Sequence, residues 1–177
     1  NNVVLIYVST ENLDDAFKLF TVLNNRGVKL RNADILKADN LSNVPENLQD
    51  GYAKQWEDIE SYFGEDFDKF LSHLQSVLVK EKARLSLLDE FEKNIFLAER
   101  LNKGDDFFNF INRYKENYEY LFDTTQDKQL KSLLMLMQVG FESDIWIAPL
   151  LKYYDKFKEE NLVKFVEKLN NKFASDW

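Results

Sequence analysis

The residues best suited to chemistry gather between Asn24 and Lys37, where amide, guanidinium, carboxylate and ammonium side chains follow one another closely. Asn24 and Arg26 lie just before Gly27, and Asp34 precedes Lys37 by three residues. An Arg guanidinium can grip a phosphate or carboxylate through two parallel hydrogen bonds, while a Lys ammonium acts as a compact point charge. The stretch from Arg26 to Lys37 holds four basic residues and one acidic residue, a local charge of +3. It is therefore the best candidate for contact with a nucleotide or DNA.

The same residues also have ordinary structural interpretations. Asn and Gly tolerate positive φ, so Asn24 and Gly27 fit the end of a helix without any ligand. Asp34 falls in the first turn of the next predicted helix, where a carboxylate meets the helix dipole favourably. Pairing between Asp34 and Lys37 would contribute only roughly 0.2–0.5 kcal/mol. Residue types and spacing leave both interpretations open.

The rest of the chain offers little chemistry. His73 is the only histidine, lies among apolar residues at helical spacing and is expected at the edge of a helix interface. Acidic clusters at 57–60 and 65–68 have no histidine or glycine-rich loop beside them, so we interpret them as helix faces rather than Mg²⁺ sites. The chain has no cysteine and no phosphate-binding loop of the G-x-x-x-x-G-K-[ST] type. We therefore expect no catalytic residue, metal or cofactor in this chain.

The charge of the chain is distributed unevenly. The net charge is -8, yet residues 1–44 hold five basic and five acidic residues, so the whole excess lies in residues 45–177. Duplex DNA repels such a surface, because DNA binding depends on neutralising phosphates. The absence of cysteine fits a reducing compartment, and no apolar run approaches the roughly 18–20 residues that cross a bilayer. We expect a cytoplasmic protein that makes no contact with a membrane.

Helical periodicity dominates the sequence. Val3–Val8 is a β-branched and aromatic run that predicts a strand. Amphipathic spacing predicts a helix from near Asn12 to Gly27 and a second helix that Asn32 caps. Further helices are predicted over 46–63 (with Gly51 as a candidate break), 65–80, 84–101, 105–122, 125–139, 147–158 and 160–173. The predicted fold is mainly α, a bundle of about eight helices with one N-terminal strand.

Two apolar stretches are assigned to the core. Phe107, Phe110 and Tyr114 follow helical spacing, which favours packing over a base-stacking platform. The densest C-terminal core is predicted at Leu133, Leu134, Leu136, Met137, Ile145, Trp146, Ile147, Leu150 and Leu151.

The spacing from Ala16 to Lys37, A-F-x-x-F-x-x-L-N-x-R-G-x-x-L-x-x-A-D-x-L-K, resembles the signature of the GmrSD-type restriction endonuclease family. Downstream, Trp56 and the W-x-x-P-L-L segment from Trp146 to Leu151 are similar to features of that family's helical part. Its members are large bacterial defence proteins with a ParB-like N-terminal (GmrS) domain, usually followed by a His-Asn-His nuclease domain. They cleave modified or phage DNA in a nucleotide-dependent way.

The resemblance implies a division of the chain. Residues 1–44 would be the C-terminal edge of a ParB-like domain, and residues 45–177 a helical bundle. The family's Asp-Gly-Gln-Gln-Arg motif is absent here, so the partners implied are a preceding ParB-like half, a following nuclease domain and, through the parent protein, DNA. The predicted strand agrees, because a lone strand needs partners from elsewhere in a longer protein or from a second copy that pairs edge to edge.

The resemblance also implies the function. The chain would be a fragment of a DNA-targeting defence protein that supports or contacts a nucleotide or DNA pocket through Asn24, Arg26, Gly27, Asp34 and Lys37. The fragment would have no chemistry of its own, while the parent would be a nuclease that uses a nucleotide and a divalent metal. Two other hypotheses remain: an autonomous helical protein-interaction module, and a small enzyme that uses the acidic clusters.

Overall fold

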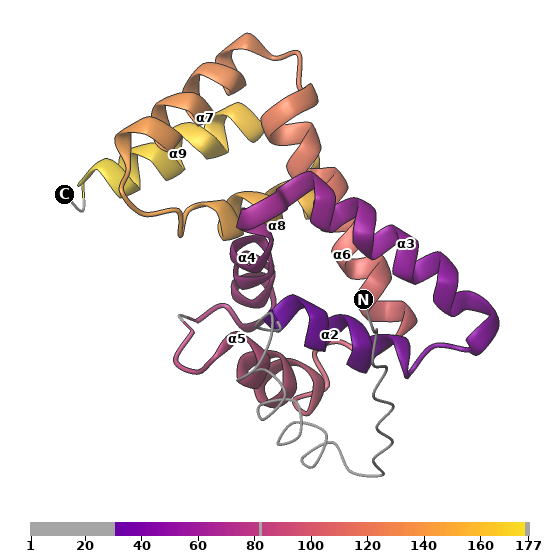
Figure 1. Ribbon diagram of the computed structural model, residues 1–177. Helices are drawn as coiled ribbons and strands as arrows, with labels where there is room; N and C mark the ends of the chain where they lie inside the picture. Colours follow the sequence, from indigo (N-terminus) through magenta and orange to yellow (C-terminus); the bar gives the residue numbers. More distant parts are fainter. Residues whose placement is uncertain (1–30, 82, 176–177) are drawn as a thin grey trace, which may run out of the picture. The chain divides into compact units, whose positions relative to one another are not determined.

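The computed structural model describes residues 31–81 and 83–175, which form helices joined by short connections and contain no strand (Figure 1). The main helices are α2 (Asn32–Leu41), α3 (Glu46–Phe63), α4 (Phe67–Val79), α6 (Asp105–Glu119), α7 (Lys128–Gly140), α8 (Ile147–Phe157) and α9 (Leu162–Ser175). The shorter elements are the 3-10 turn η1 (Gly64–Asp66), the one-turn helix α5 (Leu87–Asp89) and the π-helices η2 (Glu90–Phe96) and η3 (Tyr120–Thr124). The mainly α, multi-helix class is confirmed for this part of the chain.

Several predicted elements can be compared directly. Helix α3 has the predicted bounds and runs through Gly51 without a break, so the proposed split there is wrong. Pro149 lies in the first turn of α8, where its missing N–H costs little. The strand Val3–Val8 and the helix ending at Gly27 lie outside the described residues and stay predictions.

Helix α2 is part of the bundle. The chain divides after Arg31, and Asn32–Trp177 form one compact unit. Within it α2 contacts α3, α4, α5 and α6, and its Ala33 and Leu36 are buried. The boundary that we predicted after residue 44 therefore falls inside this unit. The helix that carries Asp34 and Lys37 is held by the bundle around it.

An aromatic cluster forms the centre of this part of the bundle. Trp56 of α3 is fully buried and packs edge-on against Phe67 of α4, with ring centroids 5.0 Å apart. Phe107 and Phe108 of α6 lie 6.0 and 6.1 Å from the same indole. Such ring pairs contribute about 0.5–1.5 kcal/mol each beyond the area they bury. The core role predicted for the aromatic residues of α6 is confirmed by the burial of Phe107, Phe110 and Tyr114.

The C-terminal core differs from the prediction at two positions. Leu134, Met137 and Trp146 are buried as expected, but Leu136 is 58% exposed and Ile145 is 62% exposed. Helix α7 packs against α9, and successive residues of a helix point about 100° apart. Leu136 therefore cannot share the face on which Leu134 and Met137 are buried.

Residues 84–101 do not form the single helix that their period predicts. The chain instead makes the one-turn α5, the π-helix η2 and a turn. The buried carboxylate of Glu90 accepts hydrogen bonds from the backbone N–H groups of Arg84 (2.7 Å) and Leu85 (3.0 Å). The segment around Arg84 therefore wraps over this carboxylate instead of starting a helix.

Gly104 joins the connection after α2 to the start of α6. Its backbone has φ +81°, and a Cβ atom there would lie 2.6 Å from the backbone oxygen of Asn43. Its N–H donates to Oδ1 of the fully buried Asn40 of α2, at 3.1 Å. Only a residue without a side chain fits this backbone contact.

Candidate functional site

The described part of the predicted site is the face of α2 that carries Asp34 and Lys37. Asp34 lies in the first turn of α2 and is half-buried. Lys37 donates from Nζ to Oε1 of Glu57 on α3, at 3.0 Å. The Lys37 side chain is only 22% exposed, whereas that of Glu57 is 65% exposed. The structure thus fixes the Lys37 ammonium group at the junction of α2 and α3, with a carboxylate from the neighbouring helix.

The sequence did not indicate this pairing. Spacing alone predicts Asp34, on the same helix, as the partner of Lys37. Glu57 was assigned to a solvent-facing acidic cluster, and only the packing of α3 on α2 brings it to Lys37. Three other members of the predicted site, Asn24, Arg26 and Gly27, lie outside the described residues, so their roles stay predictions.

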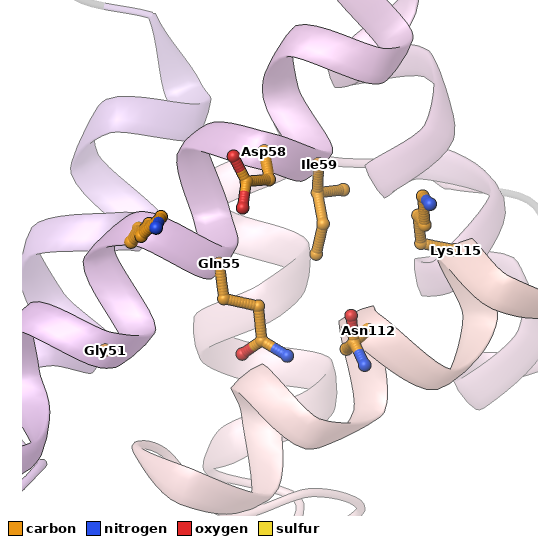
Figure 2. Close-up of a pocket in the computed structure, with 7 residues that line it drawn as sticks. Gly51, Gln55, Asp58, Ile59, Asn112 and Lys115 are labelled. Carbon is orange, nitrogen blue, oxygen red and sulfur yellow. The ribbon is translucent and has the colours of Figure 1, made fainter.

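A polar groove lies between α3 and α6, and no sequence pattern indicated it. Its volume is about 360 Å³. Five lining residues come from α3 and two from α6: Gly51, Lys54, Gln55, Asp58, Ile59, Asn112 and Lys115. Figure 2 shows the Gln55 and Asn112 side chains on the two facing helices, with Lys115 further along α6. The groove exists only because α3 packs beside α6, and the sequence of either helix alone does not predict that packing.

The groove is lined by amide, ammonium and carboxylate groups that can hydrogen-bond a small polar ligand. Asp58 is the carboxylate of this lining, and no histidine, serine, threonine or tyrosine lies beside it in the described lining, so no pair of nucleophile and base is assembled there. Lys115 is engaged already, since its Nζ contacts Glu119 and lies 4.8 Å from the ring centre of Tyr62. Lys54 and Asp58 are the other charged residues of the lining, so the groove presents both signs of charge to a ligand.

His73 lies at a helix interface, as predicted, and it has a partner that the sequence did not reveal. Its side chain is 10% exposed, and Nε2 lies 3.5 Å from Oδ2 of Asp144 in the connection before α8. Lys69, one turn earlier on α4, places Nζ 2.9 Å from the same oxygen. A cavity of about 60 Å³ adjoins His73 and Lys69. The cluster ties α4 to the chain segment that precedes α8.

The protonation states follow from these contacts. Burial lowers the pKa of His73 below its usual 6.5, an effect that the nearby Asp144 only partly offsets. Burial alone would raise the pKa of Asp144, but the hydrogen bond from Lys69 and the positive charges beside it outweigh this, and the pKa is lowered. Near neutral pH the cluster is a neutral imidazole beside a carboxylate–ammonium pair. No described hydroxyl nucleophile is bonded to His73, so the geometry is structural rather than that of a catalytic triad.

Glu90 is the most deeply buried carboxylate of the described chain. Burial alone would raise its pKa, but hydrogen bonds from Asn94, from the backbones of Arg84 and Leu85 and from Gln75 outweigh this, and the pKa is lowered. All of these hydrogen bonds stabilise the charged form of Glu90. Glu90 is therefore a structural anion that organises η2.

The acidic clusters lie on helix surfaces. Glu57 bonds to Lys37, and Asp68 accepts a hydrogen bond from Asn32 Nδ2 at 3.4 Å. In the part of the chain that the structure describes, no three histidine, cysteine or carboxylate side chains gather closely enough to hold a metal ion. None of the helices formed by residues 31–81 and 83–175 is long and apolar enough to cross a membrane.

Comparison with known proteins gives a family but no activity. No curated protein and no solved structure matches this chain. One family does match, over residues 23–173, so the match covers α2 to α9 and begins just before Asn24. The chain therefore belongs to a family of unknown function, DUF7834.

Proposed function

We propose that this chain is the helical part of a GmrSD-like DNA-targeting defence protein. In this role the bundle holds α2, and through it the segment from Asn24 to Lys37, against a nucleotide or DNA pocket that the rest of the parent protein completes. The chain has no chemistry of its own. The parent is a cytoplasmic, nucleotide-dependent nuclease that uses a divalent metal, and its ParB-like half and nuclease domain are the partners of this chain.

The fixed position of Lys37 carries the proposal. Lys37 is a cation of the signature-like segment, and Glu57 holds it from the neighbouring helix at 3.0 Å. An exposed pair of this kind contributes about 0–1 kcal/mol to stability, so stability alone is a weak reason for it. A lysine held in place but still 22% exposed can reach a phosphate without the entropic cost of ordering a free side chain.

The charge distribution supports the same role. The stretch from Arg26 to Lys37 is locally +3, whereas all of the net charge of -8 lies after residue 44. The acidic bundle would keep DNA away from its own surface and leave the basic segment as the place of contact. The described clusters at His73 and Glu90 are satisfied internally, which fits a supporting domain without a catalytic centre of its own.

The test uses the full-length product of the gene that encodes this chain. Arg26→Ala and Lys37→Ala should lower nucleotide- or DNA-dependent turnover more than they lower the thermal midpoint. Arg26→Lys should also be harmful if the guanidinium grips a phosphate through two bonds. Full turnover in both alanine variants, or a loss of turnover that merely follows a loss of folding, would reduce the segment to a packing motif. An Asp-Gly-Gln-Gln-Arg motif encoded upstream would support the family relationship independently.

A second candidate is a helical protein-interaction module. The observation that favours it is the exposed apolar face of α7, where Met135 is 67% and Val139 is 81% exposed. The two candidates differ in what the gene encodes upstream. A reading frame without a ParB-like half would favour the interaction module.

A further inference from the structure

Helix α7 is apolar on two opposite faces. Leu130, Leu134 and Met137 are buried on the side that packs against α9, beside which α7 runs in Figure 1. The apolar residues of the other side are strongly exposed: Met135 67%, Leu136 58% and Val139 81%. A surface helix normally has one apolar stripe and a polar opposite face. The packing of the described residues therefore does not explain the second stripe of α7.

The charges around this stripe are also unusual. Lys128 and Lys131 lie at the N-terminal end of α7, where the helix dipole disfavours cations. Lys128 shares the exposed face with Met135 and Val139, because residues seven and eleven apart return to one side of a helix. Glu142 is exposed just beyond the C-terminal end. None of these three charged side chains forms an ion pair with another described residue.

We propose that the exposed face of α7 binds the same face of a second copy of this chain, with the two α7 helices antiparallel about a twofold axis. An isologous contact requires a surface that complements itself. The midpoint between Lys128 and Glu142 is position 135, and the midpoint between Lys131 and Glu142 falls between positions 136 and 137. An axis beside Met135 and Leu136 therefore places either lysine within a turn of the partner's Glu142.

This arrangement accounts for both unusual features at once. Met135, Leu136 and Val139 cover their counterparts at the centre of the contact, where burial of apolar surface drives association. The lysines find carboxylates at each end, which fixes the antiparallel direction and disfavours the parallel one, in which like charges would meet. Helices that pack in this way approach to about 8–10 Å between axes, close enough for these side chains to interdigitate.

The first test is the mass of the 177-residue chain, measured by sedimentation equilibrium over a range of concentrations up to about 1 mM. The chain should dimerise, and Val139→Lys should raise the dissociation constant by about tenfold or more. Lysine at this position suits the C-terminal end of a helix, so the fold should be retained. Leu97→Lys is the matched control, because Leu97 is 71% exposed but lies outside α7, and it should leave the dissociation constant unchanged.

The second test addresses the charged ends. Replacing both Lys128 and Lys131 with Glu should weaken the dimer, and adding Glu142→Lys to that variant should restore it. Circular dichroism and the thermal midpoint check the fold of every variant, and Met135→Ser replaces Val139→Lys if that variant is misfolded. A wild-type chain that is monomeric throughout, a dimer that Val139→Lys leaves intact, or a charge reversal without rescue would each overturn the proposal.

Discussion

Lysines near α2 form ion pairs with neighbouring carboxylates, whereas the lysines at the start of α7 do not pair with any described residue. Lys37 pairs with Glu57, and Lys103 lies 2.8 Å from both Asp39 and Glu92, so carboxylates of the bundle hold both of these lysines. Lys128 and Lys131 of α7 form no ion pair within the described chain. The apolar residues of the two helices differ as well: Ala33 and Leu36 of α2 are buried, whereas Met135, Leu136 and Val139 of α7 are exposed. Because the described lysines and apolar residues of α2 have partners within the chain, this helix suits a supporting role. The exposed face of α7 lacks such partners among the described residues, so it suits contact with another molecule.

The largest expected effect comes from two leucines of α7 that lie two positions apart. Leu134→Ala should destabilise the protein by about 2–5 kcal/mol, because Leu134 is 2% exposed and its removal leaves a cavity. Leu136→Ala should cost the monomer less than about 0.5 kcal/mol, because Leu136 is 58% exposed. Urea unfolding at low protein concentration measures both. Equal losses would mean that the second stripe of α7 is core and not a free surface.

A glycine pair sharpens the comparison on the side of α2. Gly104→Ala should cost about 1–3 kcal/mol, because alanine resists φ +81° and its Cβ would press on the Asn43 backbone. Gly140→Ala at the end of α7 meets nothing within 4 Å and should be neutral or stabilise by up to about 1 kcal/mol. Thermal unfolding of the two variants, compared with wild type, is sufficient. A harmless Gly104→Ala would contradict the close contact between the α2–α3 connection and α6.

The His73 cluster predicts how stability depends on pH. The pKa of His73 is lowered on folding, so as pH falls the unfolded chain takes up the proton first. Its contribution is fully present above the usual pKa of 6.5 and is lost as pH falls below it. Asp144, whose pKa is also lowered, adds a loss of the same sign at more acidic pH. The free energy of unfolding, measured from pH 8 to pH 5, should fall, and His73→Gln should flatten that fall. An unchanged slope in the variant would remove His73 from this account.

The sequence predicted the parts of the fold that depend on local pattern. Pro45 and Gly64 bracket a long amphipathic run, and α3 has the bounds that this pattern implies. The region from 84 to 101 was not predictable in the same way, because Glu90 is an unremarkable helical residue until the packing buries it and brings the Arg84 backbone to it. Leu136 illustrates the same limit. The apolar run in α7 does not indicate which face of the helix packs against another helix.

The site was predictable only in part, for a related reason. Residue types within one segment pointed to Asp34 and Lys37, and both lie on one helix, as their spacing required. Glu57, Asp144 and the groove between α3 and α6 depend on contacts between distant segments, so no local spacing indicates them. Tertiary packing determines which groups lie next to a charged side chain. Those groups determine whether the side chain forms a structural ion pair or contacts a bound molecule.

A small effect on stability is expected for the Lys37–Glu57 pair. Lys37→Ala and Glu57→Gln should each lower the free energy of unfolding by less than about 1 kcal/mol, because the pair is partly exposed and water screens it. Chemical unfolding of the 177-residue chain provides the measurement, with the Lys69–Asp144 pair as a comparison in which His73 is also involved. A loss of several kcal/mol would show that the pair is a principal support of α2.

The same two variants test the central claim most directly when they are made in the full-length protein and turnover is measured with nucleotide and DNA. Lys37→Ala removes the cation itself, whereas Glu57→Gln removes only the charge that holds it. If Lys37 of α2 contacts the nucleotide or DNA pocket, Lys37→Ala should lower turnover by about tenfold or more. Glu57→Gln should lower turnover by clearly less, because it keeps the cation and removes only the charge that orders it. Equal and small effects of the two variants on turnover would contradict that contact and leave α2 with a purely structural role.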